Sequence, residues 1–325
     1  MTFSTPLDFS RYGTTSEEWK EFERANAELI KSFSMSHSKS TDPADIQAAM
    51  NRLGEEGSKS RLEKRGLWDV VEAQDYSVAG RDGNAIPIRC YRPKASGQKT
   101  LPVYIYYHGG GYFVGSLETD EWMCVTWAHE LSIAVISVNY RHTPQVSGLA
   151  PWHDSIDAFE WIADNTSTLG VDPERITVGG ISAGGSLAAA VATHDVRKAI
   201  AAGTTPRIRG QVLAIPVLFL DFPYHLFASK EKVAHFQNAN SAILGQADMD
   251  YICELLRKNS DVPLDHPTWN PGATEKDVLQ HMPRTAIIAS GSDVLRDHPL
   301  LYAHRLQDAK YDFPSSGHDC RRDVY

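Results

Sequence analysis

The sequence predicts an α/β fold in which a mostly parallel central sheet is flanked by helices on both faces. From about residue 101 onward, short continuous apolar segments alternate with helical segments, and glycine-rich turns follow two of the apolar segments. Buried strands that alternate with helices are typical of a parallel sheet covered on both sides. A chain of 325 residues is long enough to bury a sizeable core.

The amino-acid composition excludes some classes of binding partner. The chain is 42% hydrophobic and 22% charged, with a formal net charge of −9. This charge argues against a nucleic-acid partner, because phosphate binding needs clustered Lys and Arg. The four cysteines show no CxxC pairing, which favours free thiols. Neither a secretory leader nor an apolar run of about 20 residues is visible, so we expect a cytoplasmic protein without a membrane span.

Residues 1–66 are predicted to form an N-terminal helical cap, and residues 67–325 the main α/β domain as one structural unit. Thr15 and Glu18 fit a capping box that opens a first helix. Asp42 and Pro43 suit the start of a second helix, whose apolar stripe runs to Leu53 before Gly54. Whether these helices form a moving lid or a fixed brace stays open.

The remaining elements follow in order. Residues 70–78 and 86–91 resemble a hairpin around Asp82-Gly83. Further strands are expected at 103–107, 133–138, 176–178, 211–218 and 285–289, and helices at 122–131, 152–163, 183–200 and 247–258.

A tight turn between the strand at 176–178 and the next helix carries the candidate nucleophile. The sequence there is Gly180-Ile181-Ser182-Ala183-Gly184. A serine on a strained strand-to-helix turn needs small neighbours, because the backbone approaches closely on both sides. The following helix directs its N-terminal N–H groups to the place where an oxyanion would form. Ser182 is therefore the predicted nucleophile.

A second glycine-rich loop, His108-Gly109-Gly110-Gly111, follows the strand at 103–107. Glycines allow successive backbone N–H groups to face an oxyanion without obstruction. The loop lacks the GxGxxG spacing of a dinucleotide site and the lysine of a P-loop. Together with Ser182 it indicates acyl-transfer chemistry.

On these motifs, the chain over residues 70–309 resembles the hormone-sensitive-lipase-like family of carboxylesterases, which have the α/β-hydrolase fold. Other matching segments are Gly115-Ser116-Leu117, Asn139-Tyr140-Arg141 with Pro144, Ala150-Pro151 before Asp154 and Asp157, and the run from Gly291 to Asp297. The resemblance implies that Asp293 is the triad acid and that Gly109, Gly110 and Ala183 supply the oxyanion N–H groups. Asp297 is expected to cap a helix or to act structurally.

The predicted base is His318, in Ser316-Gly317-His318. It follows Asp293, in the order Ser, Asp, His expected for this fold. The resemblance places a full strand before this histidine and a helix after it, and we expect the C-terminal strand and helix to be shortened or missing here. Two possibilities stay open: His318 reaches Ser182 on a shortened loop, or the triad is incomplete. Other candidate bases, weighed as packing or loop-holding residues instead, are His108, His142, His153, His298 and His304.

The sequence therefore predicts a serine carboxylesterase acting on a short- or medium-chain ester of a small molecule. It needs no metal and no cofactor, and a homodimer is compatible with the resemblance. One alternative is an amidase, deacetylase or non-hydrolytic cyclase or lyase with the same motifs. The other is a catalytically silent ligand-binding member that has lost the histidine.

Overall fold

The computed structural model describes residues 3, 5–31 and 42–309 of the chain. Its seven strands form one sheet in the order β1-β2-β4-β3-β5-β6-β7. The strands are β1 Val71–Ala79, β2 Ala85–Pro93, β3 Leu101–Tyr107, β4 Ala134–Val138, β5 Val171–Ile181, β6 Ile208–Ala214 and β7 Arg284–Ile288. β1 and β2 form an antiparallel hairpin and β2 pairs antiparallel with β4, whereas all other pairs are parallel. The predicted mostly parallel sheet is confirmed.

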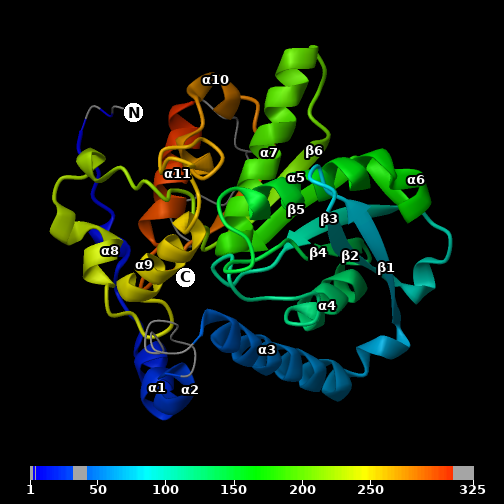
Figure 1. Ribbon diagram of the computed structural model, residues 1–325, viewed down its shortest axis with the longest axis horizontal. Helices are drawn as coiled ribbons and strands as arrows, with labels where there is room; N and C mark the ends of the chain where they lie inside the picture. Colours follow the sequence, from blue (N-terminus) through cyan, green and yellow to red (C-terminus); the bar gives the residue numbers. More distant parts are fainter. Residues whose placement is uncertain (1–2, 4, 32–41, 310–325) are drawn as a thin grey trace.

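Helices cover both faces of this sheet. They are α1 Glu17–Ala25, α2 Ala27–Lys31, α3 Pro43–Arg65, α4 Glu121–Leu131, α5 Ala150–Asp164, α6 Thr166–Leu169, α7 Ala183–Ala202, α8 Ala234–Gln237, α9 Gln246–Arg257, α10 Lys276–Leu279 and α11 Asp297–Asp308. Short 3-10 turns are η1 Ser10–Tyr12, η3 Leu67–Asp69, η4 Lys94–Ser96, η5 Tyr224–Leu226, η6 Lys230–Lys232 and η7 Pro271–Ala273. Figure 1 shows α3 and α4 on one side of the strands and α5, α6 and α7 on the other.

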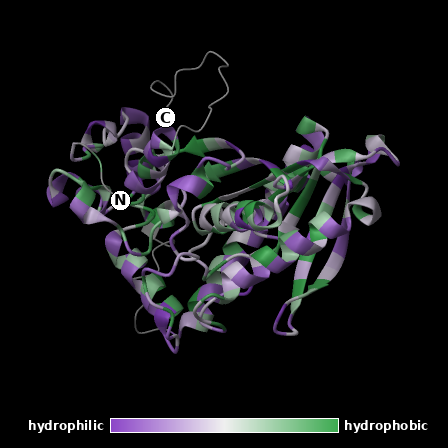
Figure 2. Ribbon diagram, turned by 90° about the horizontal axis from the view of Figure 1, so that it is seen from above, coloured by the Kyte–Doolittle hydropathy of each residue, from purple (hydrophilic) through white to green (hydrophobic). Residues whose placement is uncertain are grey.

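Alternation along the central strands divides the core into two layers. On β3, Ile105 and Tyr107 pack into the larger cluster that contains side chains of α5 and α7, whereas Tyr106 faces a smaller cluster formed with α3 and α4. Successive residues of a strand point to opposite faces, so a strand buried on both sides is apolar throughout. The outer helices show hydrophilic and hydrophobic stretches in alternation (Figure 2), as amphipathic helices do.

Three sequence expectations about element ends were wrong. Ser16, not Thr15, caps α1, because its side chain accepts a hydrogen bond from Trp19 N–H. α3 begins at Pro43 with Asp42 as its N-cap, as expected, but runs through Gly54 to a left-handed Gly66. Gly54 and Gly57 both lie inside this helix, and a glycine there costs only about 1 kcal/mol, which tertiary contacts can offset. The strand expected over 211–218 ends at Ala214, and the chain then leaves the sheet at Ile215, whose φ is 42°.

The N-terminal segment lies against residues 221–240. Leu7 exchanges backbone hydrogen bonds with that segment, donating to Leu226 O and accepting from Ala228 N–H. Asp8 forms an ion pair with Lys232. In Figure 1, α1 and α2 lie on the same side of the molecule as α8 and α9. None of the helices within residues 5–31 and 42–309 is long and apolar enough to cross a membrane.

Candidate active site

Ser182 occupies a strained position between β5 and α7. Its φ is 54° and its ψ −116°, a conformation that non-glycine residues rarely adopt. Its N–H donates to Ala214 O at 2.9 Å, which ties the turn to the neighbouring strand. We call residues 180–184 the serine turn.

The glycines of the serine turn are required by close backbone packing. A Cβ on Gly184 would collide with the carbonyl oxygen of Tyr107, the last residue of β3. A Cβ on Gly180 would collide with the backbone of Gly184 itself. The sequence pattern Gly-x-Ser-x-Gly therefore has a steric cause here.

The loop at residues 108–111 adjoins the serine turn. Gly110 has a φ of 114°, and a Cβ there would collide with Val114 O. The N–H groups of Gly109, Gly110 and Ala183 donate no hydrogen bond to another described residue. Gly110 lines the same cavity as Ser182, and Gly109 and Ala183 are the chain neighbours of these two residues. Three unpaired donors therefore lie within or next to the wall of one cavity.

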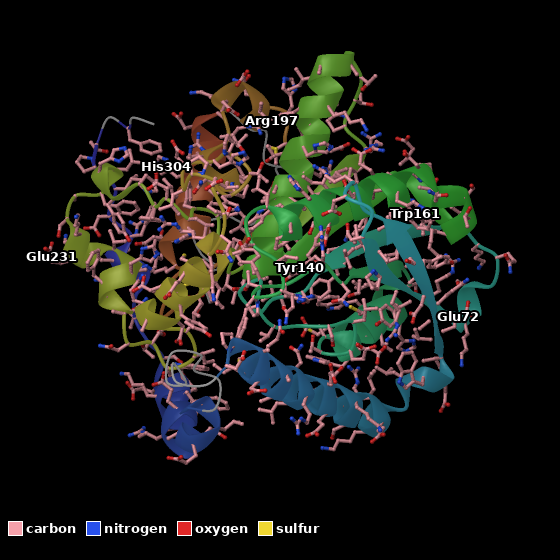
Figure 3. The ribbon with its side chains drawn as sticks, viewed as in Figure 1. Glu72, Tyr140, Trp161, Arg197, Glu231 and His304 are labelled. Atoms are coloured by element: carbon pink, nitrogen blue, oxygen red, sulfur yellow. The ribbon has the colours of Figure 1, made fainter. Side chains whose placement is uncertain are left out.

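His108, the first residue of this loop, packs against Tyr140 and His142. Its side chain is fully buried, and Tyr140, at the centre of the molecule in Figure 3, donates from its hydroxyl to His108 O at 2.9 Å. Nε2 of His142 lies 3.2 Å from Nε2 of His108. Burial lowers the pKa of both histidines, to about 3 for His142. Both rings are therefore neutral and structural at neutral pH.

Asp293 lies on a turn that follows β7, at the same edge of the sheet as Ser182. We call residues 290–295 the acid turn. Oδ1 of Asp293 accepts a hydrogen bond from Leu295 N–H at 2.9 Å. Burial raises the pKa of Asp293 to about 6, and the hydrogen bond from Leu295 N–H opposes this effect only in part. A carboxyl in this state is suited to receive a cationic partner.

Ser182 and Asp293 line one cavity with a volume of about 500 Å³. Its wall is mostly apolar and combines the loop after β3, the serine turn and the acid turn with parts of α1, α3, α9 and the segment between β6 and α9. The apolar side chains are Trp19, Met50, Val114, Ile215, Val217, Leu220, Ile243, Leu244, Met249, Ile252 and Leu295. None of these was predicted as a site residue. The three-residue spacing of Met249 and Ile252 on α9 was an available signal, because it places both on one helix face.

No histidine within the described ranges lines this cavity. His298, the histidine next to the acid turn, is fully buried on α11 and contacts His235 instead. Asp297 is structural as expected, since it pairs with the buried Arg296 and accepts from Ala234 N–H. His318 lies outside the described residues. Within residues 5–31 and 42–309, no three His, Cys, Asp or Glu side chains gather as metal ligands would.

Comparison with known proteins identifies the family of this chain. Residues 104–317 match the model of a family described as alpha/beta hydrolase fold. The carboxylesterase NlhH of Mycobacterium tuberculosis is 33% identical over 71% of this chain and 69% of its own length. The carboxylic ester hydrolase LipN of the same species is 32% identical over 74% of this chain, and that match spans 60% of the relative's length.

Solved esterase structures are similar in three dimensions. A Pyrobaculum calidifontis esterase has a TM-score of 0.68 at 29% identity, covering 84% of this chain and 83% of its own. An ester hydrolase from the metagenome of Lake Arreo, solved with a bipyridine phosphonate derivative, has a TM-score of 0.70 at 31% identity, covering 83% and 78%. The chain belongs to the alpha/beta hydrolase fold family, among its hormone-sensitive-lipase-like carboxylesterases.

Proposed function

We propose that the protein is a serine carboxylester hydrolase acting on a short- or medium-chain ester of a small molecule. The observation that carries the proposal is the strained Ser182 at the wall of a mostly apolar cavity that also contains Asp293. Strain at a non-glycine residue is retained where function needs it. The size of the cavity suits a small ester.

In this mechanism the Ser182 oxygen attacks the ester carbonyl carbon while His318 takes the hydroxyl proton. His318 then gives that proton to the leaving alkoxide, and water hydrolyses the acyl-enzyme by the same two steps. Asp293 orients the imidazole and stabilises its cationic form. The N–H groups of Gly109, Gly110 and Ala183 stabilise the oxyanion of each tetrahedral intermediate.

The assignment of the base rests on elimination and chain order. Of the thirteen histidines in the sequence, all but His37 and His318 lie in the described ranges, and none of those lines the cavity. Of the remaining two, only His318 follows Asp293 in the order expected for this fold. We further propose that residues 1–66 act as a cap over the catalytic domain of residues 67–325, because Trp19 and Met50 contribute to the cavity wall.

Hydrolysis of p-nitrophenyl acetate and butyrate by the wild type, Ser182→Ala and His318→Ala tests the proposal. Activity in the wild type and loss in both variants is the expected result. Loss of activity in Ser182→Ala alone would mean that a group other than His318 acts as the base. A wild type that hydrolyses neither ester would contradict the proposed ester hydrolysis and favour a ligand-binding role.

The same assay with p-nitroacetanilide tests the amidase alternative. A relative at 28% identity is named human arylacetamide deacetylase-like 3. If the anilide is hydrolysed faster than the esters, the protein is an amidase and not an esterase.

A further inference from the structure

The acid turn is held by side chains from a segment distant in sequence. Nδ2 of Asn238 donates to the carbonyl oxygens of Gly291 and Asp293, at 3.1 and 2.7 Å. The hydroxyl of Ser241 donates to Ser292 O at 2.6 Å. Three consecutive carbonyls of the acid turn therefore accept hydrogen bonds from residues 238–241.

These bonds fix the direction of the Asp293 side chain. A carbonyl held in place fixes the plane of its peptide group, because the peptide is rigid. The planes on both sides of Asp293 determine where its Cα–Cβ bond points. Asn238 binds one of these two carbonyls and Ser241 binds the other, so residues 238–241 set the direction in which the Asp293 side chain leaves the backbone.

The segment that carries Asn238 is itself anchored. At the start of α8, Ala234 N–H donates to Oδ2 of Asp297 at 2.7 Å. At its end, Oε1 of Gln237 accepts from the guanidinium of the buried Arg296 at 2.8 Å. Asn238 therefore acts from a fixed platform on the same side of the molecule as the turn that it binds.

The behaviour of other asparagines shows that these contacts are not ordinary helix caps. Asn26, Asn165 and Asn238 all occupy the C-cap of a helix. Asn26 and Asn165 donate from their side chains to a carbonyl of their own helix, Phe22 O and Trp161 O. Asn238 instead reaches 53 and 55 residues along the chain.

We propose that Asn238 is a positioning residue for the catalytic acid: its amide holds the acid turn so that the Asp293 carboxylate faces the imidazole of the base. The inference rests on the proposed role of Asp293. It assigns to the segment between β6 and β7 a part in catalysis besides forming the cavity wall.

A double-mutant cycle on p-nitrophenyl butyrate hydrolysis tests the inference, with Asn238→Ala, Asp293→Asn and the double variant. Asn238→Ala is expected to lower kcat about 10- to 100-fold with little change in KM, because small misplacements of catalytic groups are costly. In the Asp293→Asn background the same substitution is expected to have no further effect. Asn165→Ala, which loses an equivalent cap hydrogen bond at the other end of the sheet, is the matched control and should retain wild-type kcat.

The pH profile provides a readout that a loss of folded protein would not change. A base less well paired with its carboxylate has a lower pKa, so the acid limb of kcat/KM should move to lower pH in Asn238→Ala. An unchanged limb, or an equal loss of kcat in the wild-type and Asp293→Asn backgrounds, would overturn the inference. Full activity of Asp293→Asn is a different result and would overturn the proposed acid as well. If Asn238→Ala does not fold, Ser241→Ala carries the same cycle.

Discussion

The serine turn and the acid turn face one cavity but are held in shape by different means. Backbone packing fixes the serine turn, where a Cβ on Gly184 has no room beside Tyr107 O. Side chains from residues 238–241 fix the acid turn, through three carbonyl acceptors. A turn fixed by its own glycines can be recognised from a short motif, whereas a turn fixed from a distance depends on the rest of the fold.

The largest expected effect is on the serine turn. Ser182→Ala should lower kcat by about 10⁴-fold or more, because the nucleophile is lost while substrate binding remains. Ser186→Ala, one helical turn further along α7 and buried, is the matched control. Steady-state kinetics on p-nitrophenyl butyrate measures both. Comparable losses in the two variants would indicate damage to the helix rather than loss of a nucleophile.

Asp293→Asn is expected to lower kcat by about 10³- to 10⁴-fold, because an amide does not stabilise an imidazolium. The same change should leave the protein as stable at pH 7 or more so, since burial raises the pKa of Asp293 and makes its ionised form costly. Urea unfolding checks the second half of this expectation. A large loss of stability would mean that the carboxylate already has a strong cationic partner.

Gly184→Ala should break the serine turn by overlap with Tyr107 O. We expect a loss of about 3 kcal/mol in the free energy of unfolding, typical of overpacking a rigid site. Gly203→Ala at the other end of α7 is the control, because Gly203 has a φ of 65° but a Cβ added there would have no atom within 4 Å. That change should cost about 1 kcal/mol, from backbone strain alone. Equal losses in urea unfolding would remove the steric explanation.

Low pH should destabilise α8 and the residues after it, which support the acid turn. Nδ1 of His298 accepts from the N–H groups of Leu218 and Phe219, so its Nε2–H donates to Nε2 of His235 at 2.9 Å. Protonated His235 would place two N–H groups in opposition, and burial lowers its pKa to about 4. The unfolded chain binds a proton below about pH 6.5 and the folded protein only below about pH 4.

The contribution of neutral His235 to the free energy of unfolding is therefore present at pH 7 and is lost as the pH falls from about 6.5 to about 4. Between pH 7 and 5 we expect protonation of His235 to lower the free energy of unfolding by about 2 kcal/mol. Urea unfolding at both pH values, compared between the wild type and His235→Gln, measures it. An identical pH dependence in the two proteins would show that His235 does not contribute.

The smallest expected effect concerns the cap. Trp19→Ala should raise KM for p-nitrophenyl butyrate about five-fold without changing kcat, because about 1 kcal/mol of apolar contact is lost. Trp68→Ala removes a surface tryptophan that does not line the cavity and is the control. An unchanged KM in Trp19→Ala would argue against a cap role for α1.

The parts of the molecule that depend on local chemistry could be predicted from sequence. The hairpin around Gly83, the strand before Ser182 and the start of α3 at Pro43 follow from turn chemistry, apolar runs and capping. The end of β6 at Ala214 could not, because the apolar residues that continue the run line the cavity instead of the sheet. Asn238 carried no local signal, since its partners are more than 50 residues away.

The most direct test of the central claim is covalent labelling with an activated aryl phosphonate, followed by peptide mass spectrometry. A phosphonate transfers to an activated serine with release of its phenol and leaves a stable adduct. We expect one adduct, on the peptide containing Ser182, formed in step with loss of esterase activity and absent from Ser182→Ala. Loss of activity with the adduct on another residue, or an active enzyme that stays unlabelled at Ser182, would contradict the account.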